Sequence, residues 1–147
     1  MKKISIIIFI LLSTAAQSLM AQSTHDFLIS GGLDLIKTDN TKIFDKAQFG
    51  VDVNYFIERR FSVGAGAELW TKGANSFVMG VRWYPVDKFF VRFRGLIGSN
   101  NVSMGAGWSQ PLNRNFRLEA IGDIYFAKPD FALRGGVSYV INYVTGK

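Results

Sequence analysis

From residue 23 onward, apolar and polar side chains alternate along the chain with a period of two. Successive side chains of a strand point to opposite faces, so this alternation predicts strands. Alternating segments of about 9 to 11 residues are long enough to cross a membrane when tilted. Eight segments fit this description: residues 26–36, 47–57, 60–70, 76–84, 89–98, 102–109, 115–126 and 131–143.

Turn-forming residues separate the segments, and the three prolines, Pro85, Pro111 and Pro129, fall in these breaks. Proline cannot donate to a strand ladder, so its exclusion from the runs supports the assignment. Only the first outward connection, roughly residues 37–46, has any length. The sequence therefore predicts an all-β, up-and-down antiparallel meander.

The two faces of the predicted strands differ in kind. One face is rich in Phe, Val, Leu and Ile and carries no charged side chain. The opposite face carries five acids and five bases: Asp34, Asp52, Glu68, Glu119 and Asp123 with Arg82, Arg92, Arg94, Arg117 and Arg134. Glycines and serines interleave with these charges, and we expect them to leave room for the long arginines.

Two architectures could use such strands, a membrane barrel with its apolar face outward or a soluble barrel or sandwich with that face inside. An eight-stranded barrel encloses only a narrow interior, which the many Phe, Trp, Tyr and Leu side chains of the apolar face would overfill. We therefore predict a closed antiparallel eight-stranded transmembrane β-barrel with the charged face in the lumen. A two-sheet sandwich remains the alternative.

Aromatic residues gather at one end of the predicted strands on the apolar face. If the first strand begins in the periplasm, each strand contributes one aromatic at its periplasmic end: Phe27, Tyr55, Phe61, Trp83, Phe89, Trp108, Phe116 and Tyr143. Aromatic rings favour the level of the lipid headgroups, where one edge of the side chain is wet and the rest is in hydrocarbon. The pattern predicts an aromatic girdle.

The first residues have the features of a secretory signal peptide. Lys2 and Lys3 precede an apolar run over residues 4–12, and small and polar residues follow at 18–22. A membrane helix would need about 20 apolar residues, roughly twice this run. We predict cleavage after Ala21, which leaves residues 22–147 as one outer-membrane barrel domain. The chain contains no cysteine, so its stability does not come from disulfides.

In strand number, alternation, girdle and charged interior, the chain resembles the small eight-stranded outer-membrane β-barrels, such as OmpX and the transmembrane domain of OmpA. The resemblance covers essentially all of residues 22–147 and rests on architecture, not on a sequence motif. It implies a closed lumen, contact with outer-membrane lipids and insertion by the outer-membrane assembly machinery, and we take a monomer as the default. Members of the family commonly end on an outward aromatic residue, whereas here residues 144–147 follow Tyr143.

We expect the lumen charges to pair and to plug the barrel, because an unpaired charge in such a cavity would cost several kcal/mol. The protein would then have a structural or interaction role. A narrow channel for small ions or solutes is the second hypothesis and a lipid-modifying enzyme the third. An enzyme would usually need a histidine base, and the only histidine, His25, lies beside Asp26 before the first strand with no nucleophile placed nearby. We assign no catalytic residue, no cofactor and no metal.

Charge adds little about partners. Without Lys2 and Lys3 the chain has 15 basic and 11 acidic residues, scattered along it, which does not favour a nucleic-acid-binding surface. Five lysines are expected near the outer rim, Lys37, Lys42, Lys46, Lys72 and Lys128. They would either contact lipopolysaccharide phosphates or remain solvated in loops.

Overall fold

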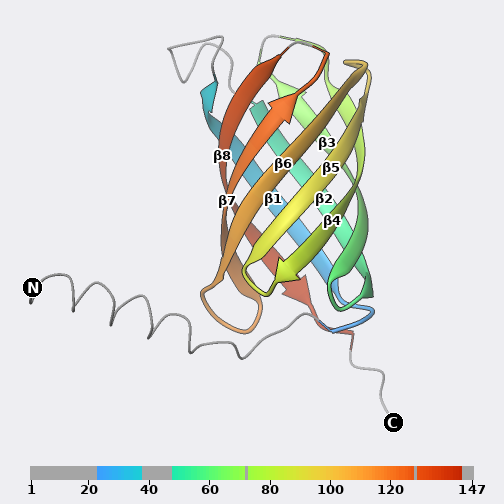
Figure 1. Ribbon diagram of the computed structural model, residues 1–147, viewed down its shortest axis with the longest axis vertical. Helices are drawn as coiled ribbons and strands as arrows, with labels where there is room; N and C mark the ends of the chain where they lie inside the picture. The colour runs from blue at the N-terminus through green and yellow to red at the C-terminus, as the bar shows by residue number, and fades with distance from the viewer. Residues whose placement is uncertain (1–22, 38–47, 72, 128, 144–147) are drawn as a thin grey trace, which may run out of the picture.

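The computed structural model describes residues 23–37, 48–71, 73–127 and 129–143, and these residues form a closed barrel of eight antiparallel strands (Figure 1). The strands are β1 (Phe27–Lys37), β2 (Gln48–Glu58), β3 (Phe61–Trp70), β4 (Ser76–Val86), β5 (Phe89–Ile97), β6 (Asn101–Pro111), β7 (Phe116–Tyr125) and β8 (Asp130–Ile141). Each strand pairs with the next in the chain, and β1 pairs with β8 to close the sheet. The predicted fold is confirmed. The predicted signal peptide and residues 38–47 of the first outward connection lie outside the described residues.

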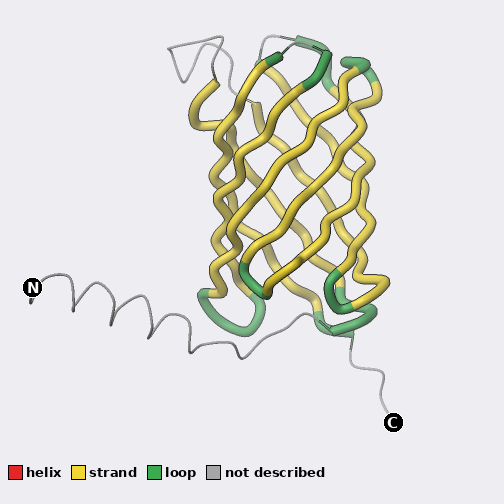
Figure 2. Tube along the Cα trace, in the orientation of Figure 1, coloured by secondary structure: helices red, strands yellow, loops and turns green. Residues whose placement is uncertain are grey.

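The two ends of the barrel differ in the connections that they carry. At the lower end in Figure 2, β1 begins, β8 ends, and short connections join β2 to β3, β4 to β5 and β6 to β7. Strands β3, β5 and β7 end at the upper end, and β4, β6 and β8 begin there. No helix in the described part of the chain is long and apolar enough to span a membrane.

The prediction that every proline lies in a break is wrong for two of the three. Pro85 is the second-last residue of β4, and Pro111 is the last residue of β6. The β4–β5 pairing shifts register between Trp83 and Val86, so the strand is irregular where Pro85 occurs. Proline is tolerated at such irregularities and at strand ends because its missing N–H removes no regular ladder bond there.

A β-bulge interrupts the alternation in β1. The β1–β8 register shifts between Asp34 and Ile36, and both Leu35 and Ile36 face outward, 46% and 58% exposed. Strict alternation would have turned Ile36 into the lumen, but the extra residue of a bulge reverses the facing of the strand residues beyond it. The bulge keeps Asp34 inside while the end of the strand stays apolar on the outside.

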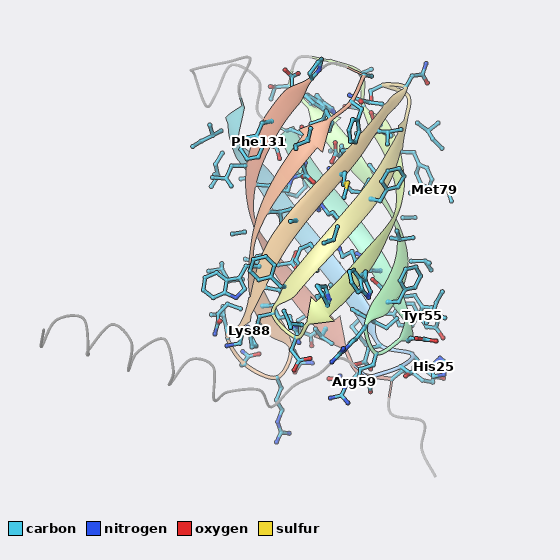
Figure 3. All side chains as sticks on the ribbon, in the orientation of Figure 1. His25, Tyr55, Arg59, Met79, Lys88 and Phe131 are labelled. Carbon is cyan, nitrogen blue, oxygen red and sulfur yellow. The ribbon has the colours of Figure 1, made fainter. Side chains whose placement is uncertain are left out.

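Elsewhere the faces are as predicted. Outward side chains such as Met79 and Phe131 project away from the barrel (Figure 3). Inward glycines make room for the arginines, since a Cβ added at Gly50 would lie 2.7 Å from Arg134 Nη1. Gly98, the last residue of the predicted segment 89–98, lies instead in the β5–β6 turn, where its φ of +114° favours glycine.

The lumen also contains two apolar clusters, one toward each end. The lower cluster consists of Leu28, Phe56, Tyr84, Phe90, Ile121 and Val140, and the upper cluster of Val78, Leu96, Tyr125 and Ala132. In the lower cluster the Tyr84 ring lies 5.7 Å from the Phe56 ring and 5.3 Å from the Phe90 ring, centroid to centroid. Along the strands, most of the lumen charges therefore lie between members of the two clusters, with Arg117 at the lower end of β7 as an exception.

We predict that Gly107→Val destabilises the barrel by about 1 to 3 kcal/mol, the usual cost of overpacking. A Cβ added at Gly107 would lie 2.4 Å from the fully buried Phe90 ring. Gly95→Val is the matched control, because a Cβ added at this outward strand glycine meets nothing within 4 Å. Urea unfolding followed by tryptophan fluorescence measures both, and equal stability of the two variants would contradict the packing described.

Candidate functional site in the barrel lumen

The structure places all ten predicted lumen charges inside the barrel. Nine are buried, and the Asp52 side chain is 16% exposed. Nine of the ten take part in ion pairs with one another: Asp34, Asp52, Glu68, Arg82, Arg92, Arg94, Glu119, Asp123 and Arg134. The tenth, Arg117, is buried on β7 two residues before Glu119.

In the upper half of the lumen, Arg134 joins two carboxylates from different strands. Its Nε donates to Asp34 Oδ1 at 2.6 Å, and its Nη2 donates to Glu68 Oε1 at 2.9 Å. These partners lie on β1 and β3, and the guanidinium reaches Glu68 across β2, where Gly50 leaves the space. A planar guanidinium can satisfy two acceptors in different directions, which a lysine ammonium does less well.

The chain of pairs continues through Arg94. Its Nη1 donates to Glu68 Oε1 at 2.5 Å, and its Nη2 lies 3.4 Å from Asp123 Oδ2. Asp123 also accepts two bonds from Arg92, one of them from Nε at 3.0 Å. Together with Arg134 and Asp34, these residues form an alternating, electrically neutral chain of three acids and three bases, called the upper ion chain below.

A second group, the lower ion triad, is centred on Arg82. Its Nη2 donates to Asp52 Oδ2 at 2.6 Å, and its Nη1 donates to Glu119 Oε1 at 3.1 Å. The Arg82 Cζ atom lies 4.9 Å from the centroid of the Phe90 ring. This cation–π contact ties the triad to the lower apolar cluster.

Several functional side chains of the lumen are absent from the predicted set. Gln48 donates to Glu68, Asn54 donates to Asp52 at 2.9 Å, and the Tyr125 hydroxyl lies 3.3 Å from Arg94 Nη2. All three occupy inward positions of the same alternation. Their inward position in the alternation is the signal that identifies them, whereas the pattern of charged residues does not include them.

At the lower rim, Asp26 joins the two ends of the described chain. Its carboxylate accepts hydrogen bonds from the Ser23 backbone N–H at 2.8 Å, Asn142 Nδ2 at 2.9 Å and the Tyr143 backbone N–H at 3.2 Å. Its neighbour His25 is exposed and forms a hydrogen bond through Nδ1 with the Tyr55 hydroxyl, at 2.5 Å (Figure 3). The structure thus places His25 at the edge of the barrel, away from the lumen carboxylates.

The predicted girdle residues form cross-strand pairs. Phe27 lies opposite Tyr55, Phe61 opposite Trp83 and Phe89 opposite Trp108. Phe116 lies opposite Tyr139, which is not one of the predicted girdle residues, with ring centroids 4.9 Å apart. Tyr143, the predicted eighth member, lies two residues beyond the end of β8.

A small void lies in the lumen beside the lower ion triad. This void, lined by Asp52, Arg82, Arg92 and Arg94, has a volume of about 10 Å³, close to the minimum for one water molecule. Among the described residues, no cluster of three or more His, Cys, Asp or Glu side chains could hold a metal ion. What this arrangement can do chemically is hold charges in fixed pairs across the lumen.

Comparisons with known proteins give fold similarity only. No family model matches the sequence, and no curated protein matches it. Among solved structures, a de novo designed transmembrane β-barrel is similar at 14% identity and a TM-score of 0.67, over 83% of this chain and 100% of the designed one. The N-terminal β-barrel domain of Pseudomonas aeruginosa OprF is similar at 13% identity and a TM-score of 0.62, over 82% of this chain and 100% of that domain.

The chain has the fold of a small transmembrane β-barrel. This fold accounts for the exposed apolar belt, since large side chains such as Met79, Trp83 and Phe93 are each more than half exposed. In a transmembrane barrel such side chains face lipid, and the ionised groups are sealed within.

We predict that Arg134→Ala lowers the free energy of unfolding by about 3 to 5 kcal/mol, because it leaves Asp34 buried without its guanidinium partner. The double variant Arg134→Met with Asp34→Leu should recover at least half of that loss. Glu68 keeps its bond to Arg94 in this variant, and no net charge is added to the lumen. A cost below about 1 kcal/mol for the single variant, the value of a solvated pair, would contradict a sealed network.

Proposed function

We propose that this protein is an outer-membrane β-barrel with a sealed lumen and a structural or interaction role in the envelope. The observation that carries the proposal is the layered filling of the lumen. On most strands the groups follow one order from the lower end upward, namely lower apolar cluster, lower ion triad, upper ion chain and upper apolar cluster. On β7, Ile121 of the lower cluster lies above Glu119 of the triad.

The order of these layers opposes ion conduction. An ion crossing the lumen would have to displace Arg82 from Asp52 and Glu119 and then pass Phe56 and Phe90, both fully buried. Breaking one partner out of a buried pair costs about 3 to 5 kcal/mol, and the apolar layer offers no replacement ligands. A narrow channel is therefore the less well supported hypothesis for the function of the lumen.

A catalytic role is not part of the proposal. Each of the five lumen carboxylates is held in an ion pair with arginine, which keeps it from acting as a free acid or base. The lipopolysaccharide contact predicted for Lys37, Lys42, Lys46, Lys72 and Lys128 remains a proposal, as do the assembly machinery as partner and the monomeric state.

Planar-bilayer recording of the purified protein tests the seal. We expect the wild-type protein to produce no conductance steps, and the combined variant Phe56→Ala, Arg82→Ala and Phe90→Ala to produce them, because it removes two large rings of the lower apolar cluster and the centre of the lower ion triad. Heat-modifiable electrophoresis of the same samples reports whether each barrel is folded. Steps from a folded wild-type barrel would favour the channel.

The outer-membrane assignment predicts that the stability cost of an outward-facing arginine depends on its depth in the membrane. Val53, outward at the middle of β2, should lose about 2 to 4 kcal/mol of stability on Val53→Arg in phospholipid vesicles. Leu69→Arg, also outward but next to the end of β3, should lose only about 0 to 1 kcal/mol. Urea titration of vesicle-inserted protein gives both values. Equal costs, or a wild-type protein that stays in aqueous solution without detergent, would contradict the proposal.

A further inference from the structure

An apolar groove of about 780 Å³ hollows the outer surface over β1, β2, β6, β7 and β8. Its walls include Leu33, Phe49, Trp108 and Val137, and its floor includes Gly31 and Gly135. A Cβ added at Gly31 would meet nothing within 4 Å, so the space above Gly31 is open, whereas a Cβ added at Gly135 would lie 3.1 Å from Leu35 Cδ1. The groove exists because glycines stand where neighbouring outward positions carry large side chains.

Strand register shows how the groove runs. Phe49, Leu33, Gly135, Ala120 and Trp108 lie opposite one another in turn, on β2, β1, β8, β7 and β6. Four inter-strand steps of about 4.8 Å give a row of roughly 19 Å. With strands tilted by about 35 to 45°, the row rises by roughly 11 to 13 Å, close to the ~15 Å depth of one leaflet of a bilayer core.

The lower edge of the groove has a different chemistry. Gln110, near the end of β6, lines it, and the Gln110 Oε1 atom is buried and accepts no hydrogen bond from the described residues. Arg114, exposed in the β6–β7 connection, follows four residues later, at most about 13 Å along the chain. Residues 109–118 contain no acid, and Glu119, which also lines the groove, is paired with Arg82 in the lumen.

We propose that this groove binds one phospholipid, with an acyl chain along the Gly31–Gly135 floor and the phosphate at Arg114. The inference rests on the proposed function, because the groove meets acyl chains only if this surface faces lipid. The apolar lining fits hydrocarbon, the rise of the row fits one leaflet, and the basic connection complements an anionic headgroup. Gln110 lies between chain and phosphate, where its carbonyl can accept a bond from a glycerol or headgroup hydroxyl.

The test uses full-length protein in phosphatidylcholine vesicles that contain a phosphatidylglycerol with a photoreactive diazirine on one acyl chain. After illumination, mass spectrometry maps the labelled peptides. In the wild-type protein we expect labelling to concentrate on β1, β7 and β8. Gly31→Leu should lower labelling there about tenfold, since its side chain takes the place of two or three methylene groups of the lipid.

Gly95→Leu is the control, because Gly95 is also an outward strand glycine with open space above it and lies on β5, outside the groove. It should leave the labelling unchanged. Arg114→Gln should lower labelling by the phosphatidylglycerol probe and not by a diazirine-labelled fatty alcohol. Heat-modifiable electrophoresis and protease protection show that each variant is inserted.

The outcomes separate the two proposals. If the wild-type protein does not insert, the proposed function fails. If it inserts and labelling is uniform around the barrel, or falls equally in Gly31→Leu and Gly95→Leu, only the lipid site is overturned. A cross-linked dimer that Gly31→Leu abolishes would also overturn it, by assigning the groove to a second copy of the chain.

Discussion

The structure depends on one constraint: a sheet of eight strands closed on itself has two unequal faces. The inner face encloses a narrow volume, and the outer face is wide. Most bulky hydrocarbon, such as Met79 and Phe93, lies outside, and inside small residues must leave room for the arginines and for the few lumen rings such as Phe90. Ionised groups taken into that narrow volume lose their hydration, so they have to pair there. Arg134 and Glu68 meet this requirement in a space that Gly50 leaves open.

The lumen is organised in layers that support one another. Arg82 pairs with two carboxylates and stacks on Phe90, so the ionic and apolar layers are in direct contact. Gly107 in turn lies against the Phe90 ring and fixes the room available to it. In the sealed lumen that we propose, the seal is a property of this packing as a whole.

The seam where β1 meets β8 combines a bulge with several glycines. Gly32 lies opposite Gly136 and Leu33 opposite Gly135, and the Leu35 bulge lies just above. Inside, Gly32 makes room for Arg134, whose guanidinium crosses the seam to Asp34. Outside, the same shortage of side chains opens the groove. One local composition therefore serves the ion network on one face and shapes the lipid-facing surface on the other.

Strand number, the facing of nearly every strand and the balance of five acids with five bases in the lumen follow from the sequence alone, because side-chain parity is a local property of each strand. The choice of ion-pair partners does not. Arg134 and Asp34 are 100 residues apart, and only closure and register bring them together. Register likewise decided that Tyr139 faces Phe116, and the bulge decided that Ile36 turns outward. The apolar clusters and the groove arise from side chains of several strands meeting at one height, which no single segment encodes.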